Sequence, residues 1–487
     1  MKSSALPDTP AHLWQHFSEI AKIPRPSGKE QAVREYIVEL AKSRNLDYVI
    51  DAAGNLIVYV PASPGYENAQ TVAIQNHLDM VAVKTEDKEH NFDTDPIELQ
   101  VIGRWLTADR TTLGADNGIG VAAALAVLTD TTTVHPRLEL VFTVEEETGL
   151  YGAQGLDASK LSATRMINLD TEDWGEIFVG CAGGYGYEAV RDFRSEPVDP
   201  TLKPYLIKLK GLAGGHSGVQ IHEQLGNANK LLAEFLTENS DLIWALAEFK
   251  GGVAHNVIAR VASVVVYIDP AQEGKWRFRM EQATQRWRTF LPDADNQLAW
   301  QFKSVDDASS SVLSASDRDL LLSLVSVLPH GAQTYSFAQP ADLVNLSCNL
   351  AVVNLQAGEL KVQTSLRFFN EHETIGLKNK IESVFKLFGM DVDIVLDYPS
   401  WNPDFNSPLV GRTAIISQKI TGKPAKLRAI HAGLECGILT SKKPDMDVVS
   451  FGPTILGAHS PTERLEIATV EPFWKMLQAL LAELAVV

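Results

Sequence analysis

Histidine and acidic residues follow the ends of four apolar segments that are expected to form strands. The segments are TVAIQNH, LELVFTV, MINL and DMDVVSF, and the polar residues at or beyond their ends are His77, Asp79, Glu145, Glu146, Glu147, Asp170 and His459. A further acidic residue, Asp116 in TTLGADNGIG, lies at the N-terminal end of an expected apolar helix. Because open α/β sheets bind ligands at the carboxyl ends of their strands, we expect these side chains to gather at one sheet edge.

Such an edge would concentrate negative charge, and repulsion would destabilise it unless cations were bound. Mixed histidine and carboxylate ligation without thiolates suits zinc, with manganese or cobalt as substitutes. Two histidines and at least three carboxylates give five ligands. This is too many for one catalytic zinc that keeps a coordination position open, but five ligands fit two ions that share a bridging carboxylate. Asp116 is the natural bridge, because a helix N-terminus would hold its carboxylate rigidly.

The residues beside these ligands indicate how the chemistry would be divided. Asp79, two residues after His77, is better placed to orient that imidazole than to bind metal. Of Glu146 and Glu147, one would bind metal while the other takes a proton from the attacking water. Taken singly, each residue has an ordinary explanation, such as a helix N-cap for Asp116 or a solvated acidic turn for the glutamates. Only their convergence favours a two-metal site.

The segments that must position these residues predict an α/β domain. Near-continuous apolar strands alternate with helices in the first third of the chain, a pattern typical of a sheet covered on both faces. Residues 11–45 predict two helices separated by IPRPSG, with Ser27 and Glu30 capping the second. After the turn-rich stretch DYPSWNPDFNSP, a helix at 408–420 and a final helix from about residue 470 restore the α/β pattern.

The middle of the chain has a different pattern of apolar and polar residues. LIKLKGL, ASVVVYI, LAVVNL and LKVQTSLRFF alternate like half-exposed antiparallel strands. Amphipathic helices are expected between them, around 225–247, 277–290 and 315–328. This combination predicts an α+β domain. The simplest organisation is one α/β domain, residues 1–185 and 396–487, interrupted by an inserted α+β domain at residues 186–395.

Composition limits the classes of function. The 487 residues carry 43 Lys and Arg against 61 Asp and Glu, a net charge of −18, so nucleic acids and anionic membranes would be repelled. Cys181, Cys348 and Cys436 are too few and too scattered for a disulfide framework. The first residues lack the apolar core of a signal peptide, and no apolar run approaches the ~20 residues that span a bilayer. We therefore expect a cytoplasmic protein.

Eight motifs together resemble a known family. They are HLDM, TTLGADNGIG, EEETGLYGA, INLD, GCAGG, GLAGGHSG, IHAGLECG and GAHSP. The family is that of the aminoacyl-histidine dipeptidases, also called Xaa-His dipeptidases, peptidase D or cytosolic carnosinase-type enzymes, which are co-catalytic dizinc peptidases. The resemblance implies a zinc-peptidase-like mixed sheet sandwiched by helices and interrupted by a lid domain. It also implies hydrolysis of unblocked dipeptides, preferentially Xaa-His and including β-alanyl-histidine.

The family pattern assigns a role to each residue of the predicted metal site. It implies two zinc ions per chain, one held by His77 and Asp170, the other by Glu147 and His459, with Asp116 as the bridge. A cis peptide bond is expected after Asp116. Glu146 matches the general base, and Asp79 matches the residue that orients the metal-binding histidine. The register of EEETG is set by counting back from Thr148–Gly149, which leaves Glu145 as the spare.

The resemblance also suggests substrate-binding residues. His216 in GGHSG matches a lid-domain histidine that would donate to the tetrahedral oxyanion. Arg367 in SLRFF would clamp the substrate carboxylate, Asn256 in HNVIA matches a lid asparagine, and Glu435 in HAGLECG could receive the substrate ammonium. The sequence departs from the pattern at RFF, where an RS-type continuation is expected, and at Ala259, where proline is usual. Lid closure would exclude longer peptides. Relatives are often dimers, so the resemblance allows a homodimer.

Three other functions remain open. A dizinc hydrolase of the same clan could cleave a broad range of dipeptides or act on acylamino acids. A metal-binding or partner-binding protein without catalysis would have no use for a free base, so retention of both Glu146 and Glu147 argues against it. A nucleotide-binding protein is suggested only by GADNGIG, which fits neither G-x-G-x-x-G nor the P-loop pattern.

Overall fold

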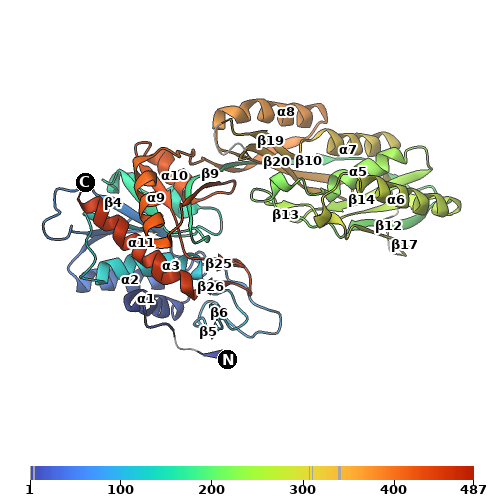
Figure 1. Ribbon diagram of the computed structural model, residues 1–487. Helices are drawn as coiled ribbons and strands as arrows, with labels where there is room; N and C mark the ends of the chain where they lie inside the picture. The colour runs from blue at the N-terminus through green and yellow to red at the C-terminus, as the bar shows by residue number, and fades with distance from the viewer. Residues whose placement is uncertain (1, 4–5, 307, 310, 338–341, 487) are drawn as a thin grey trace. The chain divides into compact units, whose positions relative to one another are not determined.

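The chain divides into two compact units. The computed structural model describes residues 2–3, 6–306, 308–309, 311–337 and 342–486 (Figure 1). Unit 1 comprises Met1–Cys181, Trp401–Ala429 and Leu434–Val487, and unit 2 comprises Ala182–Ser400 and Ile430–Gly433. Unit 2 is therefore almost entirely one long insertion into unit 1.

Unit 1 is built on an eight-stranded mixed sheet. In spatial order its strands are β2 (Asp47–Ile50), β3 (Leu56–Val60), β7 (Leu138–Thr143), β4 (Val72–His77), β8 (Arg165–Asn168), β24 (Asp447–Ser450), β9 (Glu176–Cys181) and β23 (Lys426–Ile430). The central strands β7, β4, β8 and β24 run parallel, so their carboxyl ends share one edge. Every residue of β4 and β7 is buried, as their continuous apolar character predicts.

Helices cover both faces of this sheet (Figure 1). On one face lie α1 (Ala11–Ala21), α2 (Gln31–Ser43), α3 (Ala115–Thr129), α9 (Pro408–Thr421) and α11 (Ile467–Ala485). Their apolar side chains share one core with alternate strand residues such as Ile74 and Leu140. On the other face, α10 (Glu435–Lys442) packs with α4 (Tyr151–Gly155), and Glu435 contacts Gln75 and Thr143. The predicted α/β fold class is confirmed.

A smaller sheet supports one loop of the site. In spatial order it contains β1 (Lys2–Ser3), β5 (Leu99–Ile102), β6 (Trp105–Ala108), β26 (Arg464–Glu466) and β25 (Ile455–Leu456). The antiparallel pair β25 and β26 encloses the loop that contains His459, whose backbone adopts the left-handed region at φ 61°. Among the described residues, no helix is long and apolar enough to cross a membrane.

Unit 2 contains a second, antiparallel sheet with helices α5 (Ala228–Glu238), α6 (Glu273–Trp287), α7 (Ala315–Val327) and α8 (Thr374–Leu387). Its strands in spatial order are β17 (Ala299–Ser304), β12 (Lys203–Lys210), β16 (Ala262–Ile268), β14 (Trp244–Gly251), β20 (Val344–Gln356), β21 (Glu359–Phe368), β10 (Gly183–Asp192) and β22 (Asp391–Tyr398). A further strand, β19 (Gly331–Tyr335), also pairs with β20.

The order of these elements contains a nested repeat. The series β12-α5-β14-β16-α6-β17 is a β-α-β-β-α-β unit, and β10-α7-β20-β21-α8-β22 is a second unit of the same type. The first unit is inserted between β10 and α7 of the second. The four strands of each unit form one half of the sheet, and the two halves join where β14 pairs antiparallel with β20. Unit 2 is thus an α+β structure made of two similar halves.

Two local predictions are wrong. The helix expected at 225–247 ends at Glu238, and Trp244–Gly251 forms strand β14 between β16 and β20. Ser27 and Glu30 do not cap α2, which has no side-chain cap. Instead, the Ser27 hydroxyl donates to Asp79 Oδ2, and Glu30 accepts from the backbone N–H groups of Gly28 and Glu145. Long-range contacts have replaced the local capping pattern.

Candidate metal centre

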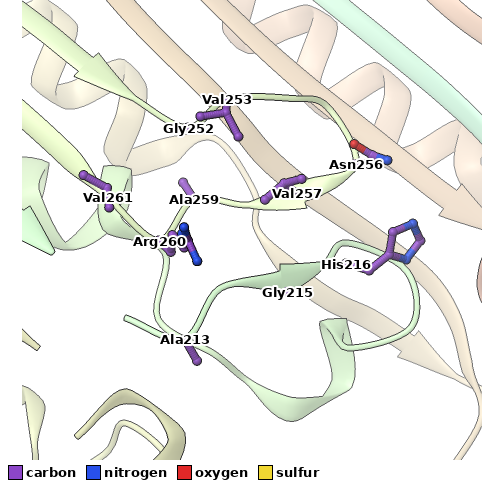
Figure 2. Close-up of a pocket in the computed structure, with 10 residues that line it drawn as sticks. All are labelled: Ala213, Gly215, His216, Gly252, Val253, Asn256, Val257, Ala259, Arg260 and Val261. Atoms are coloured by element: carbon purple, nitrogen blue, oxygen red, sulfur yellow. The ribbon is translucent and has the colours of Figure 1, made fainter. Parts of the chain in front are cut away.

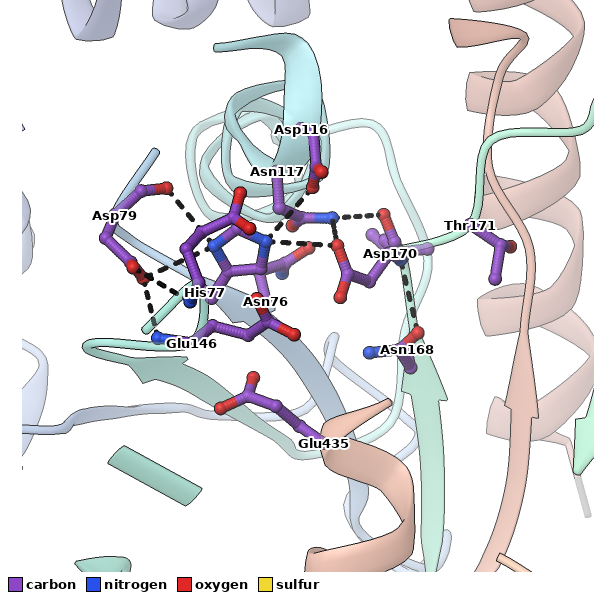
Figure 3. A network of polar contacts seen from close by, with 12 residues as sticks. Asn76, His77, Asp79, Asp116, Asn117, Glu146, Asn168, Asp170, Thr171 and Glu435 are labelled. Carbon is purple, nitrogen blue, oxygen red and sulfur yellow. Dashed lines mark hydrogen bonds and ion pairs between the residues drawn. The ribbon is translucent and has the colours of Figure 1, made fainter. Parts of the chain in front are cut away.

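The predicted ligands converge where the parallel strands of unit 1 end (Figure 3). His77 is the last residue of β4, Asp170 follows β8 by two residues, and Glu147 follows β7 by four. Asp116 lies in the first turn of α3, and the loop between β25 and β26 supplies His459. The sheet edge therefore collects side chains that are far apart in the sequence, as the motif positions predicted.

Asp116 lies between two histidines. Its Oδ1 is 3.1 Å from His77 Nε2, and its Oδ2 is 3.1 Å from His459 Nε2. The first imidazole is also 3.3 Å from Asp170 Oδ1, and the second is 3.0 Å from Glu147 Oε2. Two clusters result, each with one histidine and one carboxylate of its own, and each oxygen of Asp116 belongs to a different cluster.

The donor set of both clusters fits a divalent cation. In each cluster one potential ligand atom per residue lies within 4.8 Å of the others, and a third group of this kind joins His77 with Glu146 and Glu147. Glu147 Oε1 is buried without a hydrogen-bond partner. Imidazole and carboxylate donors without thiolate suit zinc or manganese. The observed grouping is compatible with two ions sharing the Asp116 carboxylate.

The turn into α3 orients the central carboxylates. The peptide bond between Asp116 and Asn117 is cis, as the resemblance implied. Asn117 Nδ2 donates to Asp170 Oδ1 at 2.5 Å and to the carbonyl oxygen of Leu169 at 2.8 Å. The amide of Asn117 therefore links the start of α3 to the segment that contains Asp170.

Asp79 is fully buried beside His77. Its Oδ1 is 3.4 Å from His77 Nδ1 and accepts the Glu146 N–H at 3.0 Å. Its Oδ2 accepts the Ser27 hydroxyl at 2.7 Å and the Glu147 N–H at 3.1 Å. Although burial alone would raise it, the adjacent His77 imidazole and these hydrogen bonds lower the pKa of Asp79 to about 2. Asp79 therefore stays ionised and fixes both the imidazole and the acidic turn.

Unbalanced negative charge is the main electrostatic feature of the site. Burial, with the nearby Asp116 and Glu147 charges, raises the pKa of Asp170 to about 6. Burial, together with the charges of Asp170 and Glu147, raises the pKa of Glu146 well above its ordinary value. Hydrogen bonds to Asp116 and Glu147 raise the pKa of His459 to about 11. Each shift has the sign that excess negative charge produces, and bound cations would relieve it.

Glu435 lies on the buried side of the site (Figure 3). Its Oε2 accepts from Gln75 Nε2 at 2.5 Å and from the Thr143 hydroxyl at 2.6 Å, while Oε1 is buried without a partner. Burial, with the charges of Asp170 and Asp79 adding, raises its pKa to about 7. Glu145 belongs to none of the three groups of potential metal ligands.

Unit 2 contains a separate cluster around Arg367, which lies on β21 and is 7% exposed. Its guanidinium donates to the Tyr398 hydroxyl at 3.2 Å and to the Ser217 hydroxyl at 3.4 Å, and lies 3.5 Å from His216 Nε2. Among the described residues, no carboxylate forms an ion pair with Arg367. Burial and the Arg367 charge lower the pKa of His431 to about 3. A buried arginine without a carboxylate partner among the described residues is a suitable anion site.

His216 and Asn256 line one cavity of about 570 Å³ within unit 2 (Figure 2). The short strands β13 (Gly215–His216) and β15 (Val257–Ile258) pair beside it, with His216 opposite Val257. The Ser217 N–H donates to the Asn256 carbonyl oxygen at 2.8 Å. The cavity wall also includes Ala259, the position where the resemblance expected proline.

Comparisons with known proteins identify the family. Residues 73–483 match the model of peptidase family M20/M25/M40. The cytosol non-specific dipeptidase of Escherichia coli K12 is 37% identical over 477 residues, which is 98% of each chain. The crystal structure of aminoacylhistidine dipeptidase from Vibrio alginolyticus has a TM-score of 0.85 and 36% identity, covering 98% of this chain and 97% of that one.

The chain belongs to peptidase family M20/M25/M40, and its fold is that of a peptidase of this family. The resemblance drawn from the motifs is confirmed at this level, and the protein is an enzyme. Human carnosine dipeptidase 1, with 11% identity and a TM-score of 0.52, shares the fold.

Several residues at these sites were not predicted from sequence. Arg25 and Ser27 lie in IPRPSG, which predicted a helix break and a capping role for Ser27 but no role at the metal centre; Arg25 stands between two prolines and is buried. Tyr398 ends an exposed strand and gave no signal. Glu463, four residues after His459, looked like an ordinary loop acid, yet it is 2% exposed.

Proposed function

We propose that this enzyme is a dizinc dipeptidase that cleaves short unblocked dipeptides, preferentially Xaa-His and including β-alanyl-histidine. The observation that supports it best is the pair of histidine–carboxylate clusters that share Asp116. His77 and Asp170 would hold one ion, and Glu147 and His459 would hold the other. Manganese or cobalt could substitute for zinc, because the ligand types suit them as well.

The residues around the ions would divide the chemistry. When bound, the two metal ions supply Lewis acidity and lower the pKa of water toward ~7. Glu146 would take a proton from the attacking water and deliver it to the leaving amine. Asp79 would keep His77 in one tautomer and would fix the turn that carries Glu146, since it accepts the Glu146 N–H.

Substrate recognition would use the charges at both ends of a dipeptide. Arg367, which lacks a carboxylate partner among the described residues, would bind the substrate carboxylate. His216 would donate to the oxyanion, and Asn256 beside it would contact the substrate. Glu435 would receive the ammonium through Oε1, its unpartnered oxygen. The lid role of unit 2 stays a prediction, and equal cleavage of tripeptides and dipeptides would contradict it.

A broad-specificity dipeptidase is the second candidate. Relatives of nearly equal identity are named a non-specific dipeptidase in one case and an aminoacylhistidine dipeptidase in the other. A panel that compares Xaa-His, Xaa-Ala, Xaa-Leu and acylamino acids at matched concentrations separates these functions. The E. coli relative is described as cytosolic, which supports a cytoplasmic location for this enzyme.

The decisive variant is Glu146→Ala. It should abolish dipeptide turnover while the protein still binds two zinc ions, because the general base is not needed to hold metal. Glu145→Ala is the matched control, since the neighbouring carboxylate belongs to no ligand group. Full activity of the Glu146 variant, or loss of zinc from it, would remove Glu146 from this role.

A further inference from the structure

Glu463 is a buried carboxylate that neither the metal clusters nor the proposed mechanism uses. Its side chain is 2% exposed. Oε2 accepts the N–H groups of Leu113 and Gly114 at 2.7 and 3.0 Å, and Oε1 accepts those of Ala115 and Asp116 at 2.8 and 3.3 Å. One carboxylate thus satisfies four consecutive backbone donors at the start of α3, where helical partners are missing.

Arg25 binds the same turn through a backbone carbonyl oxygen, that of Gly114. The guanidinium is 4% exposed, and Nη2 donates to the Gly114 carbonyl oxygen at 2.5 Å. Nη1 donates to the carbonyl oxygens of Leu78 and Asp79, both at 2.8 Å. A Cβ atom on Gly114 would lie 2.7 Å from Nη2, and the φ of Gly114 is +68°, so this position requires glycine. Arg25 therefore joins the end of β4 to the turn before α3.

Glu463 also belongs to the loop that contains His459. Its N–H donates to the Ser460 carbonyl oxygen at 3.0 Å, within the turn that follows the histidine. The carboxylate reaches residues almost 350 positions earlier in the chain, where a local cap would have sufficed for helix stability alone. Its bonds connect the segment of Asp116 to the segment of His459, whose side chains are 3.1 Å apart.

We propose that Glu463 is a positioning residue of the metal centre, which fixes the Asp116 carboxylate relative to His459, with Arg25 holding the opposite side of the turn. The proposal rests on the proposed function, in which Asp116 and His459 bind metal. Without the Glu463 carboxylate, the four N–H groups would lose their shared acceptor. The turn would then relax, and the ligands would have to be ordered at the expense of metal affinity.

Glu463→Gln tests this with a matched control. The amide replaces one acceptor oxygen by a donor, so two of the four N–H groups lose their partner. Glu139→Gln is the control, because Glu139 is 1% exposed and accepts the N–H groups of Ser162 and Ala163 at 2.9 to 3.1 Å, near the amino end of β7. Both variants should lower the melting temperature of the metal-free protein.

Only the Glu463 variant should alter metal binding. Competition with a chelator should show zinc affinity reduced by about 10- to 100-fold. This is the usual effect of removing a hydrogen bond that orients a metal-binding residue. The visible spectrum of the cobalt-substituted protein should also change, while Glu139→Gln keeps the wild-type spectrum and affinity. Glu463→Asp, which keeps the charge but is too short to reach all four donors, should weaken zinc binding in the same direction.

Failure of the positioning role of Glu463 and failure of the proposed metal site give different results. If wild type binds two zinc ions and both folded Glu463 variants bind zinc within about threefold of Glu139→Gln, the positioning role is overturned, since scatter of that size accompanies neutral substitutions. If Asp116→Asn binds zinc as tightly as wild type, the proposed metal site itself is wrong.

Discussion

Replacing Asp79 by Asn tests how the site is held together. The carboxylate accepts three hydrogen bonds, from the Ser27 hydroxyl and from the N–H groups of Glu146 and Glu147. It also lies 3.4 Å from His77 Nδ1, whose hydrogen bond goes to the Asp79 backbone carbonyl oxygen at 3.1 Å. The least damaging amide orientation keeps Oδ1 on His77 and Glu146 and lets Nδ2 donate to the rotated Ser27 hydroxyl. The Glu147 N–H then faces a second donor and loses its acceptor.

The structure sets the size of the effect. Leaving one buried N–H unsatisfied costs about 1–3 kcal/mol, and removing the negative charge 3.4 Å from the His77 imidazole costs about 1 kcal/mol more. The sum, ~2–4 kcal/mol, corresponds to a loss of roughly 30- to 1000-fold, at about 1.4 kcal/mol for each factor of ten. Because His77 and Glu147 are proposed zinc ligands, part of this loss should appear in metal affinity.

The assay is kcat/KM for a dipeptide at saturating zinc, paired with zinc affinity from chelator competition. Ser27→Ala is the control, because it removes one hydrogen bond from the same carboxylate and leaves the carboxylate charge in place. A bond to a charged group is worth about 1.5–3 kcal/mol, and because Ser27 is only partly buried, water can replace its hydroxyl and the loss should stay near the lower value, roughly tenfold. Asp79→Asn should lose more activity than this control. An Asp79 variant as active as Ser27→Ala, with unchanged zinc affinity, would show that Asp79 does not hold the site together.

Four further predictions follow from named contacts. Arg367→Met should raise KM by about 30- to 100-fold for a dipeptide with a free carboxylate, as expected for a lost charge-assisted pair, and should leave kcat/KM of the C-terminal carboxamide analogue unchanged; equal losses for both substrates would exclude the carboxylate role. His16 is 7% exposed between Tyr36 and Thr129, and burial lowers its pKa to about 4. The pKa of His16 in the folded state lies below the unfolded value of about 6.5. The neutral imidazole therefore contributes fully to the free energy of unfolding above pH 6.5, and this contribution decreases by roughly 2–3 kcal/mol as the pH falls toward 4. Urea unfolding should therefore show a smaller acid-induced loss for His16→Gln than for wild type, and parallel curves would contradict this. Removing metal with a chelator should lower the melting temperature and zinc should restore it, because a ligand that binds only the folded state stabilises it; an unchanged melting temperature would contradict bound metal. If the chain forms the homodimer that its resemblance allows, light scattering should give twice the chain mass of 53.3 kDa, and the single-chain mass would exclude it.

The convergence of the candidate ligands was predictable because it follows from a general property of parallel sheets. Strands that are buried on both faces are recognisable as short apolar runs, and their carboxyl ends meet at one edge. The residues at the ends of β4, β7 and β8 are therefore brought together by topology, without any need to know the loops. Apolar helix α3 was equally visible, because all of its residues except Asp116 and Thr129 are buried.

Other features depend on contacts that sequence patterns do not encode. Ser27 matched a helix-capping pattern, but Asp79, 52 residues away, provides a charged acceptor that competes successfully for its hydroxyl. Trp244–Gly251 continues the helical pattern of α5, yet pairing with β16 and β20 makes it a strand. The nested repeat of unit 2 is a repeat of topology without visible sequence similarity. The surroundings of Arg367 depend on the pairing of distant strands.

Five side chains are proposed to hold two ions around one shared carboxylate. Anomalous diffraction at the zinc edge, on crystals of protein purified without added metal and then given zinc, tests it directly. We expect two peaks, one contacted by His77, Asp116 and Asp170, the other by Asp116, Glu147 and His459. A single peak, or peaks that do not share Asp116, would contradict it.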